Sequence, residues 1–172
     1  VYIMLHKPAG VTSTVSDPHA RQTVLDLVQV PQRVFPVGRL DRDTEGLLLL
    51  TNDGDFMQRL THPSHGIRKT YIVSTDRELT PTELASLRRG IVIEGRKVET
   101  EDVRVLAPGA THLCIHEGRK HIVRLLFTLL GHRVKRLVRV SVGPLTLGNL
   151  ALGKWRQLSP GEVAALKRSG HS

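Results

Sequence analysis

GRLDRDTEGLLLLTNDG, residues 38–54, places a charged turn close to an apolar strand. Four of the five residues from Arg39 to Asp43 are charged, and both signs are present. Four consecutive leucines, residues 47–50, follow shortly after. Their length and flanks predict a buried strand. The charges therefore either cap a turn and balance one another, or form a site that the strand holds rigidly in place.

The net charge of +9 is concentrated in one part of the chain. Residues 118–161 carry nine Lys or Arg and no acid, whereas the other 128 residues carry 16 basic and 16 acidic side chains. This segment is either a solvated basic surface or the footprint of a polyanion, and we favour the second. Its aromatic residues are sparse, so shape and phosphate contacts are expected to dominate over base stacking.

Composition limits the class of protein further. The chain has 172 residues, 40% of them apolar, which is enough for one domain or for two small lobes that share a cleft. Its only cysteine, Cys114, excludes internal disulfides and fits a reducing cytoplasm. No apolar run approaches the roughly 20 residues of a membrane span, so we expect no membrane partner.

The pattern along the chain predicts a mixed α+β fold. Capping signals predict two helices: Thr80, Pro81 and Glu83 before one, and Ser159 with Glu162 before the other. Hairpin-length turns outnumber helical crossovers, so we expect a largely antiparallel sheet with flanking helices, in two lobes around a basic cleft. Strands are predicted at residues 1–7, 46–51, 68–75, 97–106, 112–116 and 133–142. Helices are predicted at residues 23–28, 56–60, 80–90, 119–131 and 159–168.

Several kinds of site find no support. The chain lacks the glycine-rich phosphate-binding and dinucleotide-binding motifs and the nucleophile elbow of hydrolases, so we expect no nucleotide cofactor. Histidines scattered through loops and strands are usually not metal ligands, and we expect no metal site. The histidines considered are His62, His65, His112, His116 and His121.

Asp41 is the main candidate for chemistry. A carboxylate at the mouth of a cleft can act as a nucleophile or as a base. It must stay ionised although it is partly desolvated, and so it needs a nearby cation. The alternative is that Asp43 or Thr44 caps a turn and the arginines only balance the acids.

The motif at residues 38–54 resembles the catalytic motif of the RsuA-like family of ribosomal-RNA pseudouridine synthases, and the large-subunit, RluB-like members are most similar. The resemblance covers nearly the whole chain. It continues in HKPAGVTST (6–14), in LTHPSHGIRKTYIV (60–73) and in the final third from His116 to Val163. It implies the pseudouridine synthase fold, a ribosomal-RNA substrate and no cofactor.

The resemblance also implies residue roles. Asp41 matches the aspartate that attacks the target uridine, and Arg39 the arginine that enters the RNA stack where the base leaves it. Tyr71 matches the tyrosine that stacks on the flipped base, and Arg124 the arginine that pairs with the aspartate. Leu137 falls where an apolar residue lines the base pocket.

One segment departs from the family pattern. The family usually writes Gly-Arg-Asn-Arg-Gln-Val-Arg-Arg where this chain has GRKHIVRL, residues 118–125. Ile122 replaces the usual amide and Leu125 the second terminal arginine. Arg124 is kept, so the implied pair with Asp41 is intact, whereas the RNA contacts of the replaced side chains are in doubt.

The resemblance implies an enzyme that isomerises a specific uridine, in the 23S rather than the 16S RNA, as a cytoplasmic monomer. Residues 1–172 would form one catalytic domain without the N-terminal S4-type RNA-binding domain of related enzymes. The alternatives are a catalytically inactive RNA-binding or ribosome-assembly factor of the same fold, and an unrelated DNA-binding protein. The first is disfavoured by the presence of Asp41, Tyr71 and Arg124, and the second lacks helix-turn-helix and zinc patterns.

Overall fold

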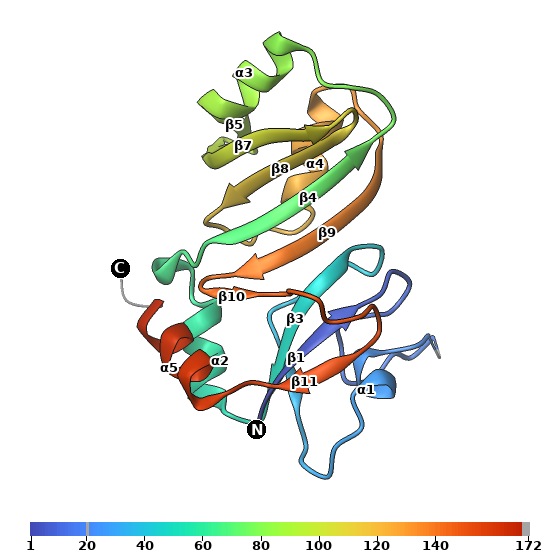
Figure 1. Ribbon diagram of the computed structural model, residues 1–172, viewed down its shortest axis with the longest axis vertical. Coiled ribbons are helices and arrows are strands. Elements are labelled where there is room, and N and C mark those ends of the chain that lie inside the picture. Colours follow the sequence, from blue (N-terminus) through green and yellow to red (C-terminus); the bar gives the residue numbers. More distant parts are fainter. Residues whose placement is uncertain (20, 170–172) are drawn as a thin grey trace.

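One nine-stranded sheet runs through both halves of the protein (Figure 1). The computed structural model describes residues 1–19 and 21–169, without the side chain of His65. The strand order is β11-β1-β3-β9-β4-β8-β7, with β2 paired to β3 and β10 to β9. The strands are β1 (Tyr2–Lys7), β2 (Phe35–Val37), β3 (Glu45–Thr51), β4 (Lys69–Thr75), β7 (Thr100–Ala107), β8 (Ala110–Ile115), β9 (Val134–Val142), β10 (Leu145–Thr146) and β11 (Trp155–Gln157). Within this sheet only β3 and β9 pair in parallel, which confirms the predicted α+β fold with a largely antiparallel sheet.

The helices divide between two lobes. In Figure 1, α3 and α4 lie with β4, β7 and β8, whereas α1, α2 and α5 lie around β1, β3 and β11. None of the helices in residues 1–19 and 21–169 has the length and apolar character needed to cross a membrane. The helices are α1 (Val24–Leu27), α2 (Gly54–Thr61), the 3-10 turn η1 (Pro63–His65), α3 (Pro81–Arg89), α4 (Ile122–Leu129) and α5 (Pro160–Ser169).

Strand β3 explains the apolar run that follows the charged turn. All seven of its residues are buried. Leu47 and Leu49 point into one hydrophobic cluster, and Leu48 and Leu50 point into another on the opposite face. Because full burial of a leucine side chain contributes about 2 kcal/mol, the four leucines hold the start of this strand rigidly.

The two lobes meet where β3 and β9 run parallel. Glu45 pairs with Val138, and Gly46 pairs with Arg139. Gly46 has a φ of +122°, and a Cβ atom there would lie 2.2 Å from the carbonyl oxygen of Arg139. Only glycine permits this approach, so the glycine ahead of the leucines is a requirement of the lobe junction.

Some elements differ from the sequence prediction. The strand predicted at residues 97–106 is two strands, because β6 (Arg96–Val98) forms a separate hairpin with β5 (Ile91–Ile93). The hairpin turn has positive φ at Glu94 and Gly95, and glutamate is an uncommon residue in that conformation, so the usual turn signal is missing. β11 was not predicted, and α4 begins at Ile122, three residues later than predicted.

Candidate active site

Residues 40–44, the Asp41 turn, lie in the connection between the strands β2 and β3. The turn closes on itself because the Thr44 N–H donates to the Asp41 carbonyl at 2.9 Å. The Ser13 hydroxyl donates to the Leu40 carbonyl at 2.8 Å and accepts from the Leu40 N–H at 3.2 Å. The backbone just before Asp41 is therefore fixed by the loop that follows β1.

Lys7 holds the other side of the turn from inside the protein. Its side chain has no exposed surface, and Nζ donates to the carbonyls of Pro8 at 2.9 Å and Arg42 at 3.0 Å. The Gly10 N–H donates to the same Arg42 carbonyl at 2.7 Å. Burial lowers the pKa of Lys7 to about 8, although nearby carboxylates oppose the shift. The HKPAGVTST segment thus contacts the turn at the residues on both sides of Asp41.

Helix α4 contacts the turn from the other lobe. Arg124 donates from one terminal nitrogen to the Asp43 carbonyl at 3.0 Å and to the Thr44 hydroxyl at 3.5 Å. The ion pair that the sequence predicted between Arg124 and Asp41 is absent from the described residues. Instead, His121 Nδ1 lies 2.8 Å from Asp41 Oδ2. The predicted pair was therefore wrong. Arg124 binds the backbone and the Thr44 hydroxyl of the turn, and His121 occupies the position next to the carboxylate.

A second link between the lobes lies next to the turn. Arg136 on β9 makes a bidentate ion pair with the nearly buried Glu45, with N–O distances of 2.8 and 3.1 Å. The bond to Glu45 raises the pKa of Arg136 further. A guanidinium engaged in this way joins β3 to β9 and is poorly available to RNA phosphates.

A cavity of about 620 Å³ opens beside the turn, between the lobes. Its lining includes every residue that the sequence predicted for the site: Arg39, Asp41, Tyr71, Arg124 and Leu137. Tyr71 and Leu137 are 8% and 3% exposed and also belong to the core of the α3–α4 lobe. They come from neighbouring strands, β4 and β9, so the sheet itself forms the apolar wall of the cavity.

The buried Arg139 and the half-buried Lys69 also line the cavity. Arg139 is 5% exposed, and its Nε donates to the Leu47 carbonyl at 3.0 Å across the junction of the lobes. Burial, reinforced by the neighbouring charge of Arg139, lowers the pKa of Lys69 to about 8. The cavity therefore combines an apolar wall with a positive interior, which suits a base attached to a phosphate backbone.

The basic segment 118–161 is less uniform than its sequence suggests, because acids outside the segment reach three of its cations. These ion pairs are Arg119 with Glu117, Arg136 with Glu45, and Arg156 with Glu162. By contrast, Arg39, Arg42 and Lys120 are exposed, line the cavity and have no side-chain partner among the described residues. Part of the available positive charge thus lies around the cavity.

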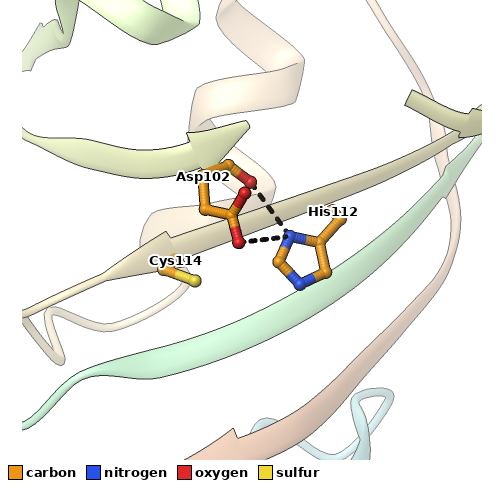
Figure 2. A group of neighbouring side chains, drawn as sticks. All are labelled: Asp102, His112 and Cys114. Atoms are coloured by element: carbon orange, nitrogen blue, oxygen red, sulfur yellow. Dashed lines mark hydrogen bonds and ion pairs between the residues drawn. The ribbon is translucent and has the colours of Figure 1, made fainter. Parts of the chain in front are cut away.

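Figure 2 shows the one group of possible metal ligands found among the described residues, Asp102, His112 and Cys114. His112 Nδ1 lies 2.9 Å from the Asp102 carbonyl oxygen, and the Asp102 carboxylate is 2.8 Å from Arg104. Arg68 approaches the same carboxylate at 3.9 Å. Two guanidinium groups already neutralise the only carboxylate of this group. The three side chains are therefore better suited to an ion-pair network than to binding a metal ion.

Sequence reasoning missed the residues that position the turn. His121 was considered only as a metal ligand, and Lys7 and Ser13 only as parts of a resembling motif. A usable signal was present, since a histidine stands where the family pattern has arginine, three residues before Arg124.

A family model described as RNA pseudouridylate synthase matches residues 1–129. The chain belongs to that family. Among curated relatives, this pseudouridine synthase is 42% identical to ribosomal large subunit pseudouridine synthase B of Bacillus subtilis, over 97% of the chain and 71% of that protein. It is 36% identical to ribosomal small subunit pseudouridine synthase A of Salmonella typhimurium, over 96% of the chain and 73% of that protein.

Solved structures agree with the family. A crystal structure of a pseudouridylate synthase superposes on this pseudouridine synthase with a TM-score of 0.88 and 33% identity, over 96% of the chain and 73% of the other. An archaeal box H/ACA complex of Nop10 and Cbf5 shares the fold at a TM-score of 0.57 and 18% identity, over 84% of the chain and 48% of the other.

Proposed function

We propose that this pseudouridine synthase isomerises a uridine of ribosomal RNA, with Asp41 as the catalytic nucleophile. The observation that carries the proposal is the cavity beside Asp41, where a carboxylate on a fixed turn shares the lining with Tyr71 and Leu137. Its volume of about 620 Å³ lies within the range of about 300–1,000 Å³ typical of small-molecule sites.

The reaction fits these groups. Isomerisation breaks the N-glycosidic bond, turns the base and forms a carbon–carbon bond between base and ribose. A carboxylate can carry the intermediate covalently, because it attacks as a nucleophile and later leaves. The reaction involves no net oxidation and no phosphate transfer, so we propose that it needs no cofactor.

The target base has to leave the RNA stack before it can enter the cavity. We assign Tyr71 to stack on the flipped base and Leu137 to form the apolar wall beside it. Arg39, exposed at the cavity, fills the space that the base leaves in the stack. Arg124 acts on the backbone of the Asp41 turn, through Asp43 and Thr44, and keeps the nucleophile in place.

The substrate is proposed to be the large-subunit RNA. The support is the higher identity to a large-subunit enzyme, 42%, than to a small-subunit enzyme, 36%. We further propose that the two lobes act together as one catalytic domain, as a monomer in the cytoplasm. The single cysteine, Cys114, is free and buried, which fits that compartment.

The test uses ribosomal RNA from cells in which the gene is deleted. Purified protein is added to this RNA, and pseudouridines are mapped by primer extension after carbodiimide treatment. A new pseudouridine at one position of the 23S RNA supports the proposal. A new pseudouridine in the 16S RNA contradicts the choice of subunit. If neither RNA gains a pseudouridine, the proposal of a ribosomal-RNA substrate is contradicted.

Asp41→Asn is the matched variant, because it keeps the size and one acceptor oxygen of the side chain and removes the charge. Its conversion rate should fall by at least about a thousandfold, which corresponds to about 4 kcal/mol of transition-state stabilisation. Affinity for RNA should change little. A variant that converts RNA at a tenth of the normal rate would show that Asp41 is not the nucleophile.

A further inference from the structure

His121 is the direct partner of the Asp41 carboxylate. Its Nδ1 lies 2.8 Å from Asp41 Oδ2, within ion-pair distance. No other side chain in the described part of the chain makes a hydrogen bond or ion pair with this carboxylate. The His121 side chain is 47% exposed, so the core does not force this contact.

The backbone of His121 has an unusual conformation, although its carbonyl accepts the first helical hydrogen bond, from the Leu125 N–H at 2.9 Å. The residue is the N-cap of α4 with φ 57° and ψ 20°, in the left-handed region that side chains rarely adopt. Its side chain makes no capping hydrogen bond, which is the usual function of a polar residue at this position. Backbone strain of this kind is found most often at functional sites.

The first turn of α4 therefore makes two different contacts with the Asp41 turn. Arg124 binds the carbonyl of Asp43 and the hydroxyl of Thr44, and so fixes the backbone. It leaves the side-chain torsions of Asp41 free. His121 contacts the carboxylate itself and removes that freedom.

We propose that His121 is the positioning residue that aims the Asp41 carboxylate, by donating its Nδ1–H to Oδ2 while Oδ1 stays available for attack. This inference rests on the proposed function of Asp41. An imidazole suits the task better than a guanidinium, because a bidentate guanidinium engages both carboxylate oxygens, whereas one ring N–H engages only one. The donor is present both in the cation and in the neutral Nδ1–H tautomer.

Two substitutions separate the hydrogen bond from the backbone strain. Glycine adopts φ 57° without strain, so His121→Gly keeps the loop and removes the donor. Asparagine also tolerates this region, and its side-chain N–H lies close to the position of Nδ1, so His121→Asn keeps both features.

We expect the kcat of His121→Gly to fall about 10- to 100-fold, because the misaimed carboxylate is rarely in the attacking geometry. RNA affinity and melting temperature should stay unchanged or rise. His121→Asn should recover the rate to within about threefold of the unmodified protein. Equal losses in both variants, a loss of RNA affinity without a loss of kcat, or full activity of His121→Gly would each overturn the proposal.

A readout independent of turnover keeps this inference distinct from the proposed function. Imidazole ¹⁵N chemical shifts should show the proton of His121 on Nδ1, and Asp41→Asn should alter these shifts. If the shifts show this contact but no uridine is converted, the proposed function fails and the positioning role fails with it. If uridine is converted but Asp41→Asn leaves the His121 shifts unaltered, only the positioning role fails.

Discussion

The first turns of α3 and α4 use their polar groups in opposite ways. In α3, the Thr80 hydroxyl accepts from the Glu83 N–H at 3.2 Å, and the Glu83 carboxylate accepts from the Thr80 N–H at 2.8 Å. His132 and Arg77 surround the same carboxylate. The polar groups of this turn are thus satisfied by each other and by close neighbours.

The start of α4 has no such closure. Its N-cap residue His121 makes no capping bond and reaches Asp41, and Arg124 reaches the backbone after Asp41. The comparison teaches that a helix start which obeys the capping rules stabilises the fold, whereas one that departs from them has its side chains available for another segment.

Removing the contact between α4 and the Asp41 turn should give the largest loss of activity. Arg124→Met keeps an unbranched apolar side chain but removes the donor to the Asp43 carbonyl, so the Asp41 turn relaxes. We expect kcat to fall about 100-fold, since a displacement of about 1 Å suffices for such a loss. Single-turnover conversion of RNA measures it.

Arg133→Met is the control for this change of charge. Arg133 is exposed just beyond α4 and does not line the cavity. Its kcat should stay within about twofold of the unmodified protein, because surface changes of this kind act weakly. An equal loss in both variants would mean that the loss follows the change in net charge and not the bond from Arg124 to the Asp43 carbonyl.

Removing the Glu83 carboxylate at the start of α3 should lower stability and leave catalysis intact. The Thr80 N–H, His132 and Arg77 hold the pKa of Glu83 at about 2, below its usual 4.5. Glu83→Gln should therefore cost about 1–2 kcal/mol of unfolding free energy at pH 7. Because the folded-state pKa is lowered, this stabilisation is complete above pH 4.5 and is lost as the pH falls toward 2.

Urea unfolding at pH 7 and pH 3 measures the Glu83 effect, and the gap between the two proteins should narrow at pH 3. Glu78→Gln is the matched control, because Glu78 is exposed and should change stability by less than about 0.5 kcal/mol. A gap that stays constant with pH would contradict the assignment to the Glu83 charge.

The smallest effect concerns the cations that flank the two helix starts. Lys120 before α4 is exposed at the cavity and has no side-chain partner in the part of the chain that the structure describes, whereas Arg77 before α3 is paired with Glu83. Lys120→Ala should reduce the slope of log affinity for RNA against log salt by about 0.7–0.9, the value for one phosphate contact. Arg77→Ala should leave the slope unchanged in the same filter-binding titration.

The same contrast explains what the sequence could predict. The α3 start at Thr80, Pro81 and Glu83 was predicted correctly, because its signals are local. The burial of residues 47–50 was also predicted correctly from a local pattern. The partner of the Asp41 carboxylate was not predicted, because its position depends on the left-handed backbone of His121. The helical periodicity of apolar residues gives no information about that conformation.

Long-range pairing was the other limit. The sequence suggested two lobes around a cleft, but not that β3 and β9 would join them in parallel. That pairing depends on the match between Gly46 and the backbone of Arg139, far along the chain. The sequence also could not show that Arg136 is engaged in an ion pair, because its partner Glu45 lies 91 residues away.

The parallel junction of β3 with β9 has a consequence for protein synthesis. Glu45 and its partner Arg136 are 91 residues apart, so a ribosome adding about 5–20 residues per second makes the second on the order of 5 to 20 seconds after the first. During that interval the start of β3, at Glu45 and Gly46, lacks its β9 partner, whereas β2 already pairs with the end of the strand. An unpaired strand edge invites pairing with other chains, and chaperones have this time in which to protect it.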